Sequence, residues 1–178
     1  MLKTIMLNKE EAMKIPVEIR SKKGLVKKGV DDYIFSKTFV VFKDIEGQMY
    51  LLAHGNREGL IQYNMSDGIA TNTTAASMVY EMLVEQGKIK NGQKLNIICC
   101  YGAIVKKTQQ KLDAMGLSHR YNDKLEFVNT TASPCTATMQ RLQNGTIRLG
   151  ICDVPMKNGK PTIKAWANVI KREIINMI

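Results

Sequence analysis

The chain has 178 residues, of which 44% are apolar and 24% charged, and its net charge is +10. This length supports one hydrophobic core, so we expect a single domain over residues 1–178, with a basic N-terminal segment at 1–37 and a core at 38–178. No apolar stretch approaches the ~20 residues that span a membrane, and charged residues follow the first apolar run too closely for a signal peptide. We therefore expect no membrane contact and a cytoplasmic location.

A hairpin is predicted near the start of the core. Residues 38–44 are rich in β-branched and aromatic side chains, residues 45–47 form a turn at Gly47, and residues 48–53 are a second apolar run. Two short apolar runs separated by a turn are typical of neighbouring antiparallel strands.

The rest of the chain alternates helices with strands. Asn72 and Thr73 are N-cap candidates for a helix that ends at Gly87, because the apolar residues between them recur on one face. The further predicted elements are strands at 94–100, 125–129 and 146–152, and helices at 104–116, 136–143 and 163–177. This alternation predicts an α/β domain with a mostly parallel sheet and helices on its faces.

The four cysteines, Cys99, Cys100, Cys135 and Cys152, form neither a dense disulfide framework nor a CxxC metal motif. We expect reduced thiols and no metal site. Cys135 lies near the start of the helix predicted at 136–143, where the helix dipole would lower a thiol pKa. We nevertheless favour core packing for Cys135, because cysteine is among the most buried residue types.

Two strands end in side chains suited to nucleophilic catalysis. The apolar run at 50–53 ends in His54 and Gly55, and the run at 95–98 ends in Cys99 and Cys100. Because a strand, a helix and a strand follow one another, we expect parallel neighbours whose ends meet at one edge of the sheet. An imidazole stabilises a thiolate and then protonates the leaving amine. Gly55 would let backbone N–H groups approach the site of an oxyanion.

This pattern resembles the caspase-like cysteine peptidases, which include clostripain, gingipain and separase relatives. They share an apolar block ending in His-Gly, a helix, and an apolar block ending in a small residue and the catalytic Cys. The separation of 46 positions from His54 to Cys100 is similar to the family's interval. The resemblance implies a three-layer caspase-like domain trimmed before the histidine strand, and a cysteine endopeptidase acting on a peptide or protein. It also implies Cys100 as nucleophile, His54 as base, backbone N–H groups near Gly55 and Cys100 as the oxyanion site, and no cofactor.

The substrate side chain stays open. Asp153, at the end of a predicted strand, and Asp67, in the loop after His54, are candidate carboxylates for a pocket that selects a basic side chain. The basic region around Lys106 would instead favour an acidic substrate.

The charge distribution supports an alternative function without catalysis. The excess of +10 lies in residues 1–37, which hold nine basic and five acidic residues, and in 88–124, which hold eight basic and two acidic residues. A basic surface from residues 20–28 and 88–124 would hold nucleic acid or an acidic protein partner. In this alternative, Cys99 and Cys100 are ordinary core residues.

Overall fold

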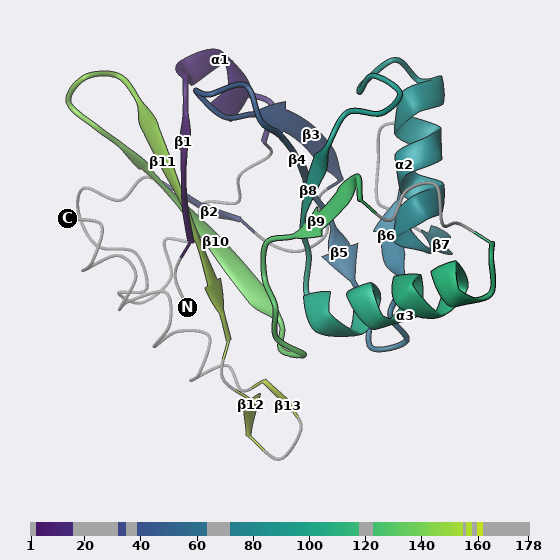
Figure 1. The fold of residues 1–178 in the computed structure, drawn as a ribbon. Helices are drawn as coiled ribbons and strands as arrows, with labels where there is room; N and C mark the ends of the chain where they lie inside the picture. The colour runs from purple at the N-terminus through teal and green to yellow at the C-terminus, as the bar shows by residue number, and fades with distance from the viewer. Residues whose placement is uncertain are drawn as a thin grey trace.

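A four-stranded sheet of order β3-β4-β8-β9 occupies the centre of the computed structural model, which describes residues 3–15, 32–34, 39–63, 72–117, 123–154, 156–157 and 160–161 (Figure 1). Its strands are β3 (Val40–Lys43), β4 (Met49–Leu52), β8 (Leu95–Ile98) and β9 (Leu125–Phe127). The hairpin prediction is confirmed, because β3 pairs antiparallel with β4. The predicted parallel neighbours are confirmed as well, since β4 pairs parallel with β8.

Two helices cover one face of this central sheet. They are α2 (Ala76–Glu85) and α3 (Gly102–Ala114), which bury Val79, Leu83 and Val105 against the sheet residues Leu51 and Ile97. The first helix begins later than predicted. Ala75 is its N-cap, while Asn72 and Thr73 belong to β7 (Asn72–Thr74).

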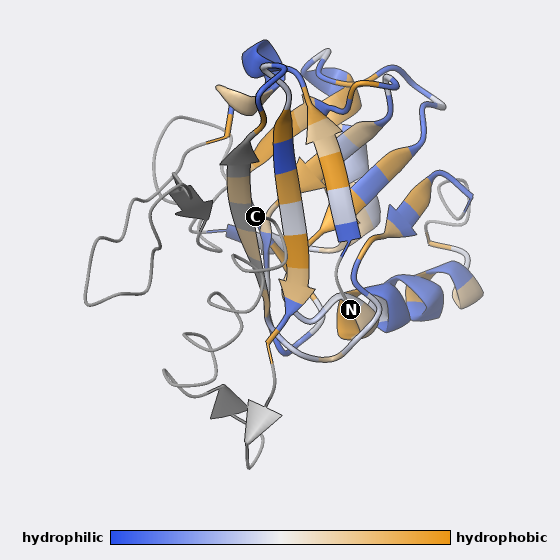
Figure 2. Ribbon diagram, turned by 90° about the vertical axis from the view of Figure 1, so that its left-hand side faces the viewer, coloured by the Kyte–Doolittle hydropathy of each residue, from blue (hydrophilic) through white to orange (hydrophobic). Residues whose placement is uncertain are grey.

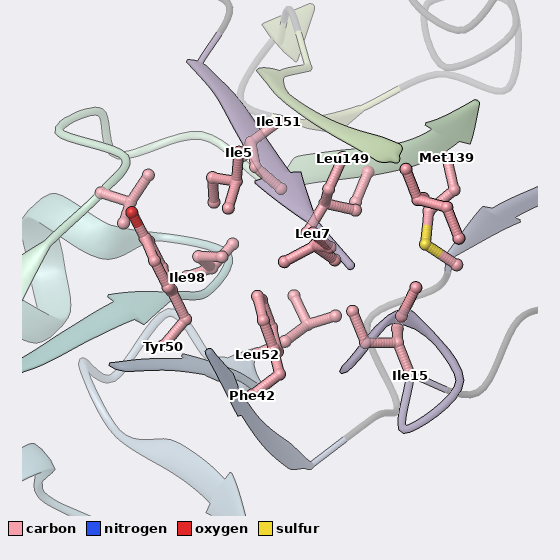
Figure 3. Packing of buried hydrophobic residues seen from close by; sticks show 14 of the residues in the cluster. Ile5, Leu7, Ile15, Phe42, Tyr50, Leu52, Ile98, Met139, Leu149 and Ile151 are labelled. Carbon is pink, nitrogen blue, oxygen red and sulfur yellow. The ribbon is translucent and has the colours of Figure 1, made fainter. Parts of the chain in front are cut away.

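A second, antiparallel sheet covers the other face. It has the order β1-β11-β10-β2 and consists of β1 (Lys3–Leu7), β11 (Ile147–Asp153), β10 (Cys135–Arg141) and β2 (Asp32–Ile34). Figure 2 views the molecule from the side of this sheet, along whose strands apolar and polar residues are interspersed. Leu7 and Leu149 of this sheet pack with Phe42, Leu52 and Ile98 of the central sheet in a common core (Figure 3).

The predicted fold class, a mostly parallel, three-layer caspase-like sheet with helices on its faces, is therefore wrong. The protein has a strand-rich α/β structure with several small antiparallel sheets and, among its described strands, only three parallel central ones. The helix predicted at 136–143 is part of strand β10. The segment pairs with both β11 and β2, and its residues Cys135, Ala137 and Met139 are buried.

The remaining described elements are short. They are α1 (Lys9–Ala12), the three-stranded sheet of β5 (His54–Gly55), β6 (Ile61–Tyr63) and β7, and the pair β12 (Met156–Lys157) and β13 (Lys160–Pro161). The helix predicted at 163–177 lies outside the described residues. Across the described ranges, no helix is both long enough and apolar enough to cross a membrane.

Candidate functional site

His54 and Cys100 follow two adjacent parallel strands at the same edge of the central sheet. Leu52 and Ile98 are register partners in β4 and β8, and each candidate residue lies two positions beyond its partner. The Ala53 N–H continues the pairing by donating to the Ile98 carbonyl at 3.0 Å. The parallel register therefore brings together the two side chains that the sequence singled out.

Gly55 lies directly against the backbone of Cys100. A Cβ at Gly55 would lie 3.2 Å from the carbonyl carbon of Cys100 and 3.3 Å from the Cys99 sulfur, and it would overlap the Cys100 carbonyl oxygen. No larger residue fits this close approach without displacing backbone. Because Gly55 has no side chain, strand β5, which carries His54, can lie this close to the backbone of Cys100.

The two adjacent cysteines point to opposite faces of the central sheet, as alternation along an extended chain requires. Cys99 is buried in the core beneath α2 and α3, whereas Cys100 belongs to the core shared with the antiparallel sheet. Burial, together with the nearby Cys100 thiolate, raises the pKa of Cys99 far above its ordinary value. Only Cys100 faces groups that stabilise a thiolate.

The sulfur of Cys100 lies against Cys135, the first residue of β10. The Cys135 N–H donates to this sulfur at 3.4 Å, and the Cys100 thiol can donate to the Cys135 carbonyl at 3.6 Å. A hydrogen bond with the Cys135 side chain lowers the pKa of Cys100 most, and the His54 hydrogen bond and charge lower it further; burial opposes them. The resulting pKa is about 5. These interactions favour the thiolate form of Cys100, although only 3% of the residue is exposed.

The pKa of Cys135 shifts in the opposite direction to that of Cys100. Its hydrogen bond to Cys100, its burial and the negative charges of Cys100 and Asp153 raise the pKa of the Cys135 thiol well above its ordinary value. One thiol of the pair thus holds a proton that it donates to the other. This is the arrangement expected when two titrating groups share one proton.

The segment 129–135 fixes the turn that carries Cys100. The buried Asn129 accepts from the Cys99 N–H at 3.3 Å and donates to the Cys99 carbonyl. Further along, the carbonyls of Thr131 and Ser133 accept from the N–H groups of Ala103 and Tyr101, both at 3.0 Å. The segment therefore holds the start of α3 as well as the nucleophile.

Tyr101, between Cys100 and α3, has a left-handed backbone with φ of +57°, and no other non-glycine residue in the described part of the chain has a positive φ. This conformation costs a bulky residue about 1–2 kcal/mol and is enriched at functional sites. Its hydroxyl accepts from Arg57 Nε at 3.3 Å, and the guanidinium lies over its ring at 5.8 Å. Arg57 is exposed and follows His54 in the chain, so this pair borders the site.

The structure brings His54, Gly55 and Cys100 together. It also places Asp153, one of the two candidate pocket carboxylates, beside Cys135. Asp153 is the register partner of Cys135, and its charge acts on the Cys135 thiol. Asp67 lies outside the described residues, as does the basic segment 20–28.

Several lysines of the second basic segment are exposed on the described surface. They are Lys88, Lys90, Lys94, Lys106, Lys107 and Lys111. Lys94 forms an ion pair with Glu126, so not all of this charge is available to a partner. Among the residues that the structure describes, no group of three or more His, Cys, Asp or Glu side chains is arranged to hold a metal ion.

The sequence reasoning missed Asn129 and the role of Cys135. The available signal was the polar run that begins at Asn129, shortly after β9, because residues beyond the carboxyl end of a parallel strand collect at the functional edge of such a sheet. Core packing, the favoured interpretation of Cys135, is correct as to burial but omits its contact with Cys100.

No family model matches this chain, and comparisons with curated proteins and with solved structures give no significant match.

Proposed function

We propose that the protein is a cysteine endopeptidase, or a close relative of one, that uses Cys100 as nucleophile and His54 as its base. The observation that carries this proposal is the pair itself: His54 and Cys100 follow adjacent parallel strands, and the imidazole contributes to the lowered pKa of the thiol. An ordinary core cysteine has a raised pKa, as Cys99 does. The resemblance of the His54-Gly55 and Cys99-Cys100 motifs to those of caspase-like peptidases supports the same chemistry.

In this proposal the Cys100 thiolate attacks the scissile carbonyl carbon, and a tetrahedral oxyanion forms. Backbone N–H groups near Gly55 and Cys100 hold this oxyanion. Protonated His54 gives its proton to the departing amine, which leaves a thioester on Cys100. His54 then takes a proton from water, and the resulting hydroxide cleaves the thioester and restores the thiolate.

Access to the sulfur is the main requirement of this mechanism. Cys100 is 3% exposed, and the backbone of Cys135 lies against its sulfur. A peptide carbonyl can reach Cys100 only when the segment 133–135 moves away. The proposed peptidase therefore has a closed resting form that opens transiently and so admits small reagents as well as substrate.

Two charges of opposite sign flank the pair and define the substrates to test. The exposed guanidinium of Arg57 would attract an acidic side chain, whereas the carboxylate of Asp153 would attract a basic one. Fluorogenic peptides with Asp, Glu, Lys or Arg before the scissile bond cover both cases. If the protein prefers acidic peptides and Arg57→Gln abolishes this preference, the substrate pocket lies on the Arg57 side. If it prefers basic peptides and Asp153→Asn abolishes this preference, the pocket lies on the Asp153 side.

The test of the proposed activity compares the two adjacent cysteines. We expect Cys100→Ala and His54→Ala each to abolish cleavage while the circular dichroism spectrum stays native. The matched control, Cys99→Ala, removes a buried thiol one residue away and should retain cleavage. Cleavage that survives Cys100→Ala would overturn the proposal.

The compartment belongs to the same proposal. None of the four cysteines, all of which lie in described segments, is in a disulfide. Reduced thiols are typical of a reducing compartment, so we propose the cytoplasm.

The exposed lysines favour a second candidate function, the binding of nucleic acid or an acidic protein. Lys106, Lys107 and Lys111 lie on one helix, α3, and Lys88 and Lys90 lie in the turn after α2. Association driven by these charges weakens steeply as salt concentration rises. This second function would be contradicted if oligonucleotide binding did not change with salt concentration. It would also be contradicted if the Lys106→Gln, Lys107→Gln double variant bound the oligonucleotide as tightly as the wild type.

A further inference from the structure

We propose that Cys100 and Cys135 form a reversible disulfide when hydrogen peroxide oxidises the protein, so that Cys135 is a resolving thiol for Cys100. The disulfide itself does not depend on peptidase activity. Its consequence, a reversible block of the nucleophile, rests on the proposed function.

The backbone of Cys135 already lies within bonding reach of the Cys100 sulfur. That sulfur is 3.4 Å from the Cys135 nitrogen and 3.6 Å from the Cys135 carbonyl oxygen. Since N and Cα are bonded at about 1.5 Å, the sulfur can be no farther than about 4.9 Å from the Cα of Cys135. In a disulfide, the sulfur of one cysteine is joined to the Cα of the other through an S–S bond of about 2.05 Å, an S–Cβ bond and a Cβ–Cα bond, which together span up to about 5.4 Å. The bond therefore needs side-chain rotation and little movement of β8 or β10.

The other two cysteines are poorly placed for this reaction. Cys99 points to the opposite face of the central sheet, into the core beneath the helices. Cys152 is on β11, where its register partner is Thr136, while Cys135 is opposite Asp153. Because neighbouring residues of a strand point to opposite faces, Cys152 and Cys135 lie on different sides of the antiparallel sheet. The geometry selects one pair out of the four thiols.

The chemistry takes two steps. First, the Cys100 thiolate attacks one oxygen of hydrogen peroxide and breaks the O–O bond, which gives a Cys100 sulfenic acid and a hydroxide that takes up a proton to become water. Second, the Cys135 sulfur attacks the sulfenic sulfur, and the departing hydroxide combines with the Cys135 proton to form the second water. Two thiols lose two electrons in total, and the peroxide gains them.

The properties of the two thiols suit these roles. Cys100 is the thiolate that peroxide oxidises first, whereas Cys135 keeps its proton until the sulfenic acid has formed. Hydrogen peroxide is also much smaller than a peptide, so it can reach the covered sulfur with less displacement of segment 133–135. Cys100 can thus be oxidised in the closed form of the protein.

The test treats the full chain with hydrogen peroxide without any substrate. After acid quenching and alkylation in guanidinium, peptide mass spectrometry locates disulfides. We expect one peptide linked through Cys100 and Cys135, which dithiothreitol returns to two. Cys99→Ala and Cys152→Ala are matched controls and should form the same link. Cys135→Ser, which keeps a side-chain hydrogen-bond donor beside Cys100, should accumulate a sulfenic acid on Cys100 that dimedone traps.

The proposal is overturned if the wild-type Cys100 accumulates the same dimedone adduct as the Cys135 variant, or if Cys100 stays reduced in the folded protein. Cleavage assays play no part in this readout. A protein without peptidase activity can therefore still pass the test, and an active peptidase can fail it.

Discussion

Replacing Gly55 with alanine is expected to force apart the two strand ends that carry His54 and Cys100. The added methyl group would overlap the carbonyl oxygen of Cys100 and lie 3.2 Å from its carbonyl carbon. These atoms belong to backbone, so no side-chain rotation relieves the overlap. Asn129 also holds the preceding residue, Cys99, through both of its backbone polar groups.

The expected cost follows from this rigidity. Overpacking a well-packed site costs about 1–3 kcal/mol, and we expect the upper end, about 3 kcal/mol, because backbone must move. Gly55 is not among the glycines with a positive φ, so the substitution adds no backbone strain. The movement also takes His54 away from Cys100 and should raise the pKa of the thiol.

Urea unfolding measures the loss of stability, and Gly47→Ala is the matched control. Gly47 has a φ of +85° and nothing within 4 Å of an added Cβ, so its substitution costs only backbone strain, about 1–2 kcal/mol. It should leave the reactivity of Cys100 unchanged. If Gly55→Ala were no less stable than Gly47→Ala and alkylated Cys100 at the wild-type pH, the close approach of the strand ends would be refuted.

Two further predictions concern the groups around the Cys100 turn. Asn129→Ala leaves two buried backbone groups of Cys99 without their partner, so urea unfolding should show a loss of about 3 kcal/mol. A loss below about 1 kcal/mol would contradict the role of both hydrogen bonds. The pKa of Cys100 is about 5 in the folded chain and ordinary in the unfolded chain. Between these values the unfolded chain binds more protons, so stability should rise with pH from about 5 towards 8.5, by up to about 1.4 kcal/mol per pH unit. Cys100→Ala should flatten this rise relative to Cys152→Ala, and equal slopes would refute the lowered pKa.

The local parts of the fold were predictable from the sequence. The apolar runs that became β3 and β4, the intervening turn at Gly47 and the strand β8 are each set by neighbouring residues. The parallel contact of β4 with β8 followed from the helix between them. This contact is what made the pairing of His54 with Cys100 predictable.

The antiparallel sheet was not predictable in the same way. Its strands come from distant parts of the described chain. For example, Lys3 of β1 lies opposite Ile151 of β11, and a local sequence pattern does not predict pairing over such a separation. The residues at 136–141 fit a helix by composition, and only their pairing with β11 and β2 makes this segment a strand. Since Cys135 reaches Cys100 through this sheet, its contact could not be foreseen either.

Site-resolved alkylation of the folded protein tests the central claim, a reactive thiolate at Cys100, most directly. Limiting iodoacetamide is applied between about pH 4 and 9, a range that includes the ~8.5 of a free thiol, and peptide mass spectrometry reads each cysteine. Because hydrogen bonds from Cys135 and His54 lower the pKa of Cys100, we predict that Cys100 reacts first, with a midpoint near pH 5. His54→Ala should move this midpoint to higher pH, while Cys99 stays unreactive until the protein unfolds. A Cys100 that is inert in the folded protein, or that titrates near pH 8.5 with or without His54, would contradict the account.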